Sequence, residues 1–285
     1  MAGRRSPSVR SRQLAAELRR LRELAGLTGE QVSERLGWSA AKVSRIETGR
    51  TAIAPADLQL LLDVYDLSGT QRERLSDLGR SARQRGWWDA YTDILGPEYA
   101  TLIALEAEAE SVDWYAAQIV PGLLQTEDYA RVMVQSTLLI SPPGEIERRV
   151  QVRMTRQRVL TREDPLRLLV VLDQTVLRKK VGGAAVMRRQ LERLGEAARS
   201  PNVEIRVLPD AVGAHPAVTG EFTILHFPEP SAPDVVYIEN MTSNLYVEHE
   251  AEVFRYNLAL DRLRSLALRP EDSQAMIAAA ADSMD

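Results

Sequence analysis

The feature that most constrains the fold is a series of short helical segments, each of which ends at a glycine. Leucines recur at helical spacing between Leu14 and Leu24, and Gly26 follows at the position of a C-terminal stop. Gly37 and Gly49 close the next two segments in the same way. The pattern predicts an N-terminal region built only of helices.

Hydroxyl residues stand where the second and third of these helices should begin. Thr28 can cap the second helix, with Gln31 three residues on as in a capping box. Ser39 can cap the third, whose Val43 and Ile46 should face the core. Two short helices joined by a tight turn match a helix-turn-helix, although an ordinary helical bundle has the same apolar spacing.

The charges of the chain are distributed unevenly. The 285 residues carry a net charge of −4, but residues 1–88 hold 16 Arg and Lys against 10 Asp and Glu. The remaining residues hold 20 against 30, so a balance of +6 is followed by one of −10. This asymmetry indicates a polyanion-binding module joined to a second part.

Composition also bounds the chemistry. The chain has no cysteine, which excludes disulfides, thiolate zinc sites and iron–sulfur clusters and fits a reducing cytoplasm. No signal peptide or membrane span is expected, because no apolar run is long enough. The histidines His215, His226 and His249 lie far apart and are expected on the surface or in the core. We therefore expect no metal, no cofactor and no enzymatic activity.

Beyond Trp88 the composition changes. Helices are expected over 106–118, 127–139, 145–161, 184–199 and 248–268. Strands are expected over 166–172, 203–208, 222–227 and 235–238. The helix between the first two strands is compatible with a parallel crossover, whereas the later strands should be antiparallel.

This pattern predicts an all-α five-helix N-terminal domain and a C-terminal α+β domain with a small mixed sheet. The expected divisions are a flexible basic arm over 1–11, a helix-turn-helix domain over 12–84, a joint over 85–105, an α+β effector or partner-binding domain over 106–270 and a frayed tail over 271–285.

The segments 21–28, 32–39 and 43–49 (LRELAGLT, VSERLGWS and VSRIETG) carry a resemblance. Residues 12–80 resemble the lambda-repressor-like, xenobiotic-response-element class of transcriptional regulators. The resemblance implies an ion pair between Arg22 and Glu47 that ties the first helix to the end of the recognition helix. Gly29 stands where this class usually has a glutamine that contacts phosphate.

Further segments extend the resemblance over almost the whole chain. RQRGWW at 83–88, LEAEA at 105–109, QIVPGLLQT at 118–126 and YAR at 129–131 resemble the WhiJ-like family of actinobacterial regulators. That family has a C-terminal domain of uncharacterised role. It implies a cytoplasmic regulator, often encoded beside a small companion protein in a toxin–antitoxin-like pair.

A recognition helix places its N-terminal turn and one face against base edges. The candidates for contact with double-stranded DNA are Thr28, Ser39, Ala40, Ala41, Lys42, Ser44, Arg45 and Arg50. Arg45 can pair with guanine, and the two alanines can touch a thymine methyl group. Lys42 and Arg50 are expected at phosphates.

Aromatic residues are concentrated near the joint, in a chain that is only 5% aromatic. They are Trp87, Trp88, Tyr91, Trp114 and Tyr115. They can line a small-molecule pocket, pack the hinge between domains or form a partner surface.

We therefore expect a sequence-specific transcriptional regulator that binds DNA as a homodimer, with a C-terminal domain that senses a ligand or protein partner and assists dimerisation. The alternative is an antitoxin-like interaction protein that neutralises a small companion protein and binds DNA only for autoregulation.

Overall fold

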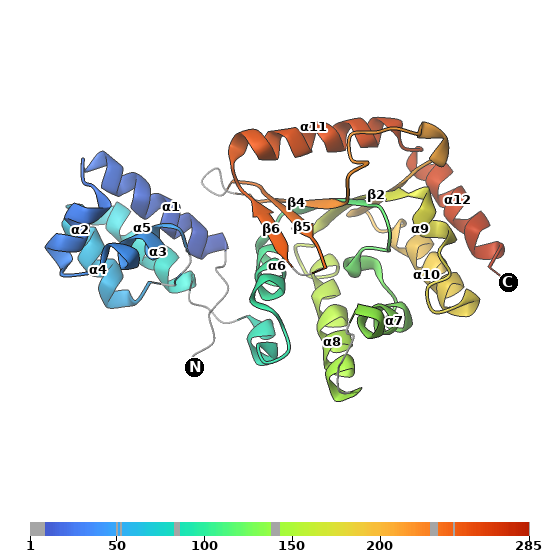
Figure 1. Ribbon diagram of the computed structural model, residues 1–285, viewed down its shortest axis with the longest axis horizontal. Coiled ribbons are helices and arrows are strands. Elements are labelled where there is room, and N and C mark those ends of the chain that lie inside the picture. The colour runs from blue at the N-terminus through green and yellow to red at the C-terminus, as the bar shows by residue number, and fades with distance from the viewer. Residues whose placement is uncertain are drawn as a thin grey trace. The chain divides into compact units, whose positions relative to one another are not determined.

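The computed structural model in Figure 1 describes residues 9–49, 51, 53–82, 86–137, 143–228, 233–241 and 243–284. The chain divides into two compact units, Met1–Glu108 and Ala109–Asp285. The joint expected over 85–105 contains the 3₁₀ turn η1 (Trp87–Tyr91) and most of α6 (Pro97–Glu108), and the two units divide just after it. The apolar side chains of α6, such as Leu102 and Leu105, are buried, which keeps this segment helical.

The first unit begins with five helices, as the glycine-punctuated sequence predicts. They are α1 (Val9–Leu24), α2 (Gly29–Leu36), α3 (Ala40–Glu47), α4 (Pro55–Val64) and α5 (Gly69–Ser81). Helix α1 already includes the last residues of the basic arm expected over 1–11, and residues 1–8 lie outside the described part of the chain.

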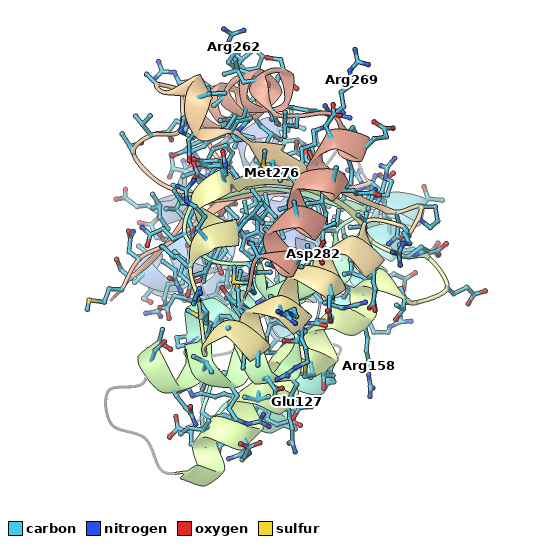
Figure 2. All side chains as sticks on the ribbon, turned by 90° about the vertical axis from the view of Figure 1, so that its right-hand side faces the viewer. Glu127, Arg158, Arg262, Arg269, Met276 and Asp282 are labelled. Carbon is cyan, nitrogen blue, oxygen red and sulfur yellow. The ribbon has the colours of Figure 1, made fainter. Side chains whose placement is uncertain are left out.

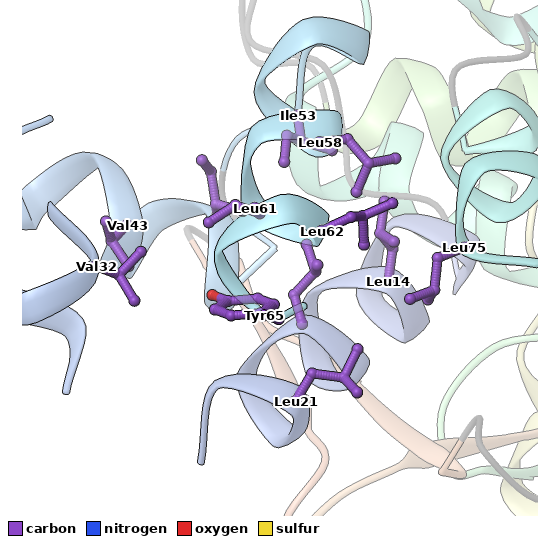
Figure 3. Packing of buried hydrophobic residues seen from close by; sticks show 12 residues of the cluster. Leu14, Leu21, Val32, Val43, Ile53, Leu58, Leu61, Leu62, Tyr65 and Leu75 are labelled. Atoms are coloured by element: carbon purple, nitrogen blue, oxygen red, sulfur yellow. The ribbon is translucent and has the colours of Figure 1, made fainter. Parts of the chain in front are cut away.

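Each of these helices contributes to one apolar core (Figure 3). Leu21 comes from α1, Val32 from α2, Val43 from α3, Leu62 from α4 and Leu75 from α5. All five are at most 5% exposed. Helices as short as α2 and α3, at eight residues each, are marginal alone, so this shared core is what stabilises them.

The second unit is built on a mixed sheet. Its strands within the described residues are β1 (Ser111–Ala116), β2 (Arg167–Asp173), β3 (Val203–Leu208), β4 (Phe222–His226), β5 (Val235–Glu239) and β6 (Asn244–Val247). They lie in the order β3-β2-β1-β4-β5-β6. The pairs β1–β2 and β2–β3 are parallel, and the pairs β1–β4, β4–β5 and β5–β6 are antiparallel. This arrangement confirms the predicted α+β class and the predicted crossover.

Helices cover both faces of this sheet (Figure 1). Helix α11 (Glu250–Leu266) lies on one face, where its Val253, Leu260 and Leu263 pack against the sheet residues Val171 and Ile224. The opposite face carries α7 (Glu127–Thr137), α8 (Pro143–Arg156) and α10 (Ala184–Ala197). The connections also contain η2 (Gly122–Leu124), η3 (Gln157–Leu160), α9 (Gln174–Arg178) and η4 (Asp210–Val212).

The C-terminal segment 271–285, expected to fray, is instead largely helix α12 (Pro270–Asp282). Ser273, Ile277 and Ala281 recur every four residues and are buried, so the alanine-rich stretch has a packing face. The hydroxyl of Ser273 accepts a hydrogen bond of 3.0 Å from the backbone N–H of Val207 in β3. Figure 2 shows α12 beside α10, while Arg262 and Arg269 point outward.

Two strands correct the expected secondary structure. The helix expected over 106–118 ends at Glu108, and β1 follows it, paired on both sides. Val112, Trp114 and Tyr115 favour a strand, and pairing with β2 and β4 decides the outcome over local sequence. The edge strand β6 was not expected because it is only four residues long.

A histidine joins three parts of this sheet. Nε2 of His226, at the end of β4, lies 3.1 Å from a carboxylate oxygen of Asp113 in β1. Its Nδ1 lies 2.7 Å from a carboxylate oxygen of Asp234, just before β5. Burial lowers the pKa of His226, but the two carboxylates outweigh burial and raise it from 6.5 to about 9.

The interactions of His226 with Asp113 and Asp234 predict that the stability of the second unit depends on pH. Because the pKa is raised on folding, the stabilisation is fully present below pH 6.5 and is lost as the pH rises through about 9. We expect a loss on the order of 2 kcal/mol, because the side chain remains 25% exposed. Urea unfolding at several pH values measures it. His226→Gln should flatten the dependence of the unfolding free energy on pH between pH 6 and about 9. His249→Gln, at an exposed position, is the control and should leave this dependence unchanged. Equal pH dependence in the unaltered protein and both variants would contradict the role given to His226.

The turn between α2 and α3 gives a prediction about backbone conformation. Gly37 adopts φ 64° and ψ 31°, in the left-handed region, and a Cβ there would meet no atom within 4 Å. Gly37→Ala should therefore destabilise the first unit by about 1–2 kcal/mol through backbone strain alone. Gly29→Ala is the control, because Gly29 has helical conformation and its nearest neighbour is 3.9 Å from the added Cβ. That variant should be stabilised by up to about 1 kcal/mol in the same denaturation measurement, and a loss equal to that of Gly37→Ala would refute the argument.

Candidate DNA-recognition surface

The position of α3 is fixed first by local capping. The hydroxyl of Thr28 accepts a hydrogen bond of 3.2 Å from the backbone N–H of Gln31, whose side-chain oxygen accepts one of 2.8 Å from the N–H of Thr28. At the start of α3, the hydroxyl of Ser39 accepts a bond of 3.2 Å from the N–H of Lys42. Each helix of the pair thus begins at a side-chain cap, and the turn at Gly37 separates them.

Helix α3 has one buried and one exposed face. Val43 and Ile46 are 2% and 4% exposed and belong to the core. Ala41, Ser44 and Arg45 lie on the exposed side, and Ser39 and Ala40 are exposed at its first turn. The structure thus brings together most of the side chains that the sequence suggests for base contact.

Arg45 is the cation of this exposed face. Within the described residues it forms no ion pair, so its guanidinium is available to an external acceptor. A guanidinium presents parallel N–H donors that match the O6 and N7 acceptors of guanine. Arg50, also expected to contact DNA, lies outside the described residues.

Lys42 has partners within the protein. Its ammonium nitrogen lies 2.9 Å from a carboxylate oxygen of Asp57 in α4 and 3.7 Å from the ring centroid of Trp38. This ion pair and cation–π contact hold Lys42 close to α4, and the phosphate contact expected for Lys42 stays a prediction. Sequence reasoning missed Asp57 and Trp38, because neither carries a local signal for this contact.

The C-terminal end of α3 is tied to α1. Nε of Arg22 donates to a carboxylate oxygen of Glu47 at 2.8 Å, and a second guanidinium nitrogen donates to the carbonyl of Leu27 at 2.8 Å. The side chains of Arg22 and Glu47 are only 13% and 9% exposed. Tyr65 lies next to the pair, and burial together with the Glu47 carboxylate raises its pKa.

The aromatic residues near the expected joint are divided between the two units. Trp87 contacts Trp88 and Tyr91 edge to face, with centroids 5.9 and 6.2 Å apart, in η1 of the first unit. Trp114 and Tyr115 are neighbours on β1 of the second unit and therefore point to opposite faces of the sheet.

Other kinds of site find no support in the described part of the chain. No group of three or more His, Asp or Glu side chains there is placed to hold a metal ion. No helix among these residues is long and apolar enough to cross a membrane.

Comparison with known families agrees with this geometry. Residues 13–75 match a family described as Helix-turn-helix domain, which places the first unit in that class and supports a helix-turn-helix regulator. Residues 99–279, more than half of the chain, match the Domain of unknown function (DUF5753). The protein therefore belongs to the DUF5753 family. No curated protein and no solved structure is significantly similar to the chain.

The ion pair between Arg22 in α1 and Glu47 in α3 predicts that the effects of substituting the two residues are coupled. Glu47→Ala removes the 2.8 Å carboxylate partner of the mostly buried Arg22 guanidinium, which keeps the Leu27 carbonyl and the carboxylate of Glu23 at 3.6 Å, so it should destabilise the first unit by about 1–3 kcal/mol. Arg22→Ala and the double variant complete a cycle whose coupling energy should be about 1–3 kcal/mol. Chemical denaturation of the four proteins measures it. Simple additivity of the two single losses would show that the pair carries no interaction energy.

Proposed function

We propose that the protein is a sequence-specific DNA-binding transcriptional regulator and that α3 is its recognition helix. The observation that carries the proposal is the two-sided character of α3, with Val43 and Ile46 in the core and Arg45 on the exposed face. A helix-turn-helix places the N-terminal residues of such a helix against base edges in the major groove. The function is one of binding, and no catalytic step is part of it.

The exposed residues of α3 have distinct roles in this proposal. Arg45 pairs with guanine, while Ala40 and Ala41 contact thymine methyl groups. Ser39 and Ser44 can donate hydrogen bonds to bases or to the backbone. Thr28 lies at the N-terminus of α2, where the helix dipole favours a phosphate.

The second unit senses a ligand or protein partner and assists dimerisation in this proposal. One helix-turn-helix covers a half-site, whereas two copies about 34–36 Å apart read a palindrome.

The alternative, an antitoxin-like interaction protein, is favoured by one observation. Phe254 and Leu258 lie one turn apart on α11 and are 59% and 53% exposed. An exposed apolar pair on a helix is typical of a protein-contact surface. In that case DNA binding serves only autoregulation.

Selection of genomic DNA fragments by the full-length protein tests the proposal and separates it from the alternative. A regulator should recover several promoters that share a motif, and a dimer should recover inverted repeats. An autoregulatory interaction protein should recover only its own promoter. Recovery of no enriched sequence would refute specific DNA binding.

The selected duplex then tests the role of Arg45. Arg45→Ala should lose about 1–3 kcal/mol of binding free energy on this duplex and much less on a scrambled one, because a base contact discriminates whereas a phosphate contact does not. Arg80→Ala is the matched control, since it removes the same charge from the 75% exposed Arg80 side chain on α5. It should have a small effect on both duplexes. An equal loss on both duplexes for Arg45→Ala would show that α3 is docked differently.

A further inference from the structure

The second unit contains a pocket that the DNA-binding role does not use. It has a volume of about 430 Å³, within the range of roughly 300–1,000 Å³ that is usual for small-molecule sites. It lies between the segment 216–222, β5 and the first half of α11. Its lining includes Ala217, Glu221, Phe222, Ile238, Arg255 and Tyr256.

Aromatic rings form one side of this pocket. The rings of Phe222 and Tyr256 meet edge to face with centroids 5.1 Å apart. Behind them, Tyr115 contacts Phe222 at 6.1 Å and His215 at 5.5 Å. This connected packing fixes the two lining rings in place, so the pocket offers a preformed apolar surface to a ring or alkyl group.

The polar group that distinguishes the pocket is the carboxylate of Glu221. It accepts a hydrogen bond of 3.4 Å from the backbone N–H of Ala117, and within the described residues no cation lies at ion-pair distance. Burial raises the pKa of this carboxyl group, and the carboxylate of Glu239 raises it further, while the Ala117 N–H and Lys179 lower it. A partly buried carboxylate has lost part of its hydration. A cation bound beside it can replace the interactions with water that burial removed.

The other charges of the pocket lie on α11 and are exposed. Glu252 and Arg255 are three residues apart and both line the pocket. Their opposite charges offset each other at the rim. Glu221 is thus the partly buried charged residue among those that line the pocket.

We propose that this pocket binds a small aromatic amine, with its ring against Phe222 and Tyr256 and its ammonium group at the carboxylate of Glu221. An ammonium at this position gains a charge-assisted hydrogen bond and lies close to aromatic faces that also attract cations. The inference gives a ligand class to the sensing role that is proposed for the second unit and rests on that part of the proposed function.

Calorimetric titration of the full-length protein with phenethylamine tests the site, with 3-phenylpropionate as a probe of similar size and opposite charge. The amine should bind and the carboxylate should bind at least about tenfold more weakly. Glu221→Gln should weaken amine binding about tenfold or more, because the amide still accepts the Ala117 hydrogen bond but carries no charge. An unfolding temperature close to that of the unaltered protein shows that this variant is folded.

Glu252→Gln is the matched control, because it removes an exposed carboxylate from the same pocket. It should change amine affinity by less than about threefold. The proposal is overturned if the amine does not bind up to its solubility limit, if the carboxylate binds as well, or if the two variants lose affinity equally. The titration contains no DNA, so such a result leaves the proposed DNA binding intact, and failure of the DNA selection does not affect the pocket.

Discussion

The pairing of β1 with a parallel strand on one side and an antiparallel strand on the other holds the second unit together. Residues Ser111–Ala116 pair with β2 through a crossover that contains α7 and α8, and with β4 through a connection that spans most of the unit. Without β1 the sheet would separate into the pair β3-β2 and the meander β4-β5-β6. The burial of Val112 and Tyr115, which point to opposite faces, shows that both helical layers depend on this strand.

The first unit depends in a similar way on contacts that orient one short helix. Helix α3 has eight residues, so its direction is set by the burial of Val43 and Ile46 and by the ion pair of Arg22 with Glu47. These contacts all lie on its inner side or at its end. The exposed side chains of Ala41, Ser44 and Arg45 take no part in these contacts.

The sequence predicts the parts of this protein that depend on near neighbours. The caps at Thr28 and Ser39 join residues three apart, and Gly37 needs only its own backbone conformation. For this reason the helix-turn-helix was predictable in detail. The pairing of Arg22 with Glu47 was available only through the family resemblance, because its partners lie 25 residues apart.

The parts of the structure that depend on residues distant in the sequence could not be predicted. The local sequence of β1 is ambiguous, and its strand state follows from neighbours that come much later in the chain. Helix α12 was missed because alanine gives no amphipathic pattern until β3 and α10 supply the surface against which Ile277 packs. The pocket was missed because Glu221, Phe222 and Tyr256 come from a loop, a strand and a helix.

The contact of Lys42 with Asp57 and Trp38 affects how the recognition helix would compete for sites in a genome. A lysine that is neutralised within the protein does not displace counterions from DNA, so it adds little to the attraction that all sequences share. Occupancy of an operator depends on the ratio of specific to non-specific affinity, multiplied by the number of competing sites. If the pair with Asp57 persists on DNA, the proposed base contacts of α3 would compete with a weaker sequence-independent attraction.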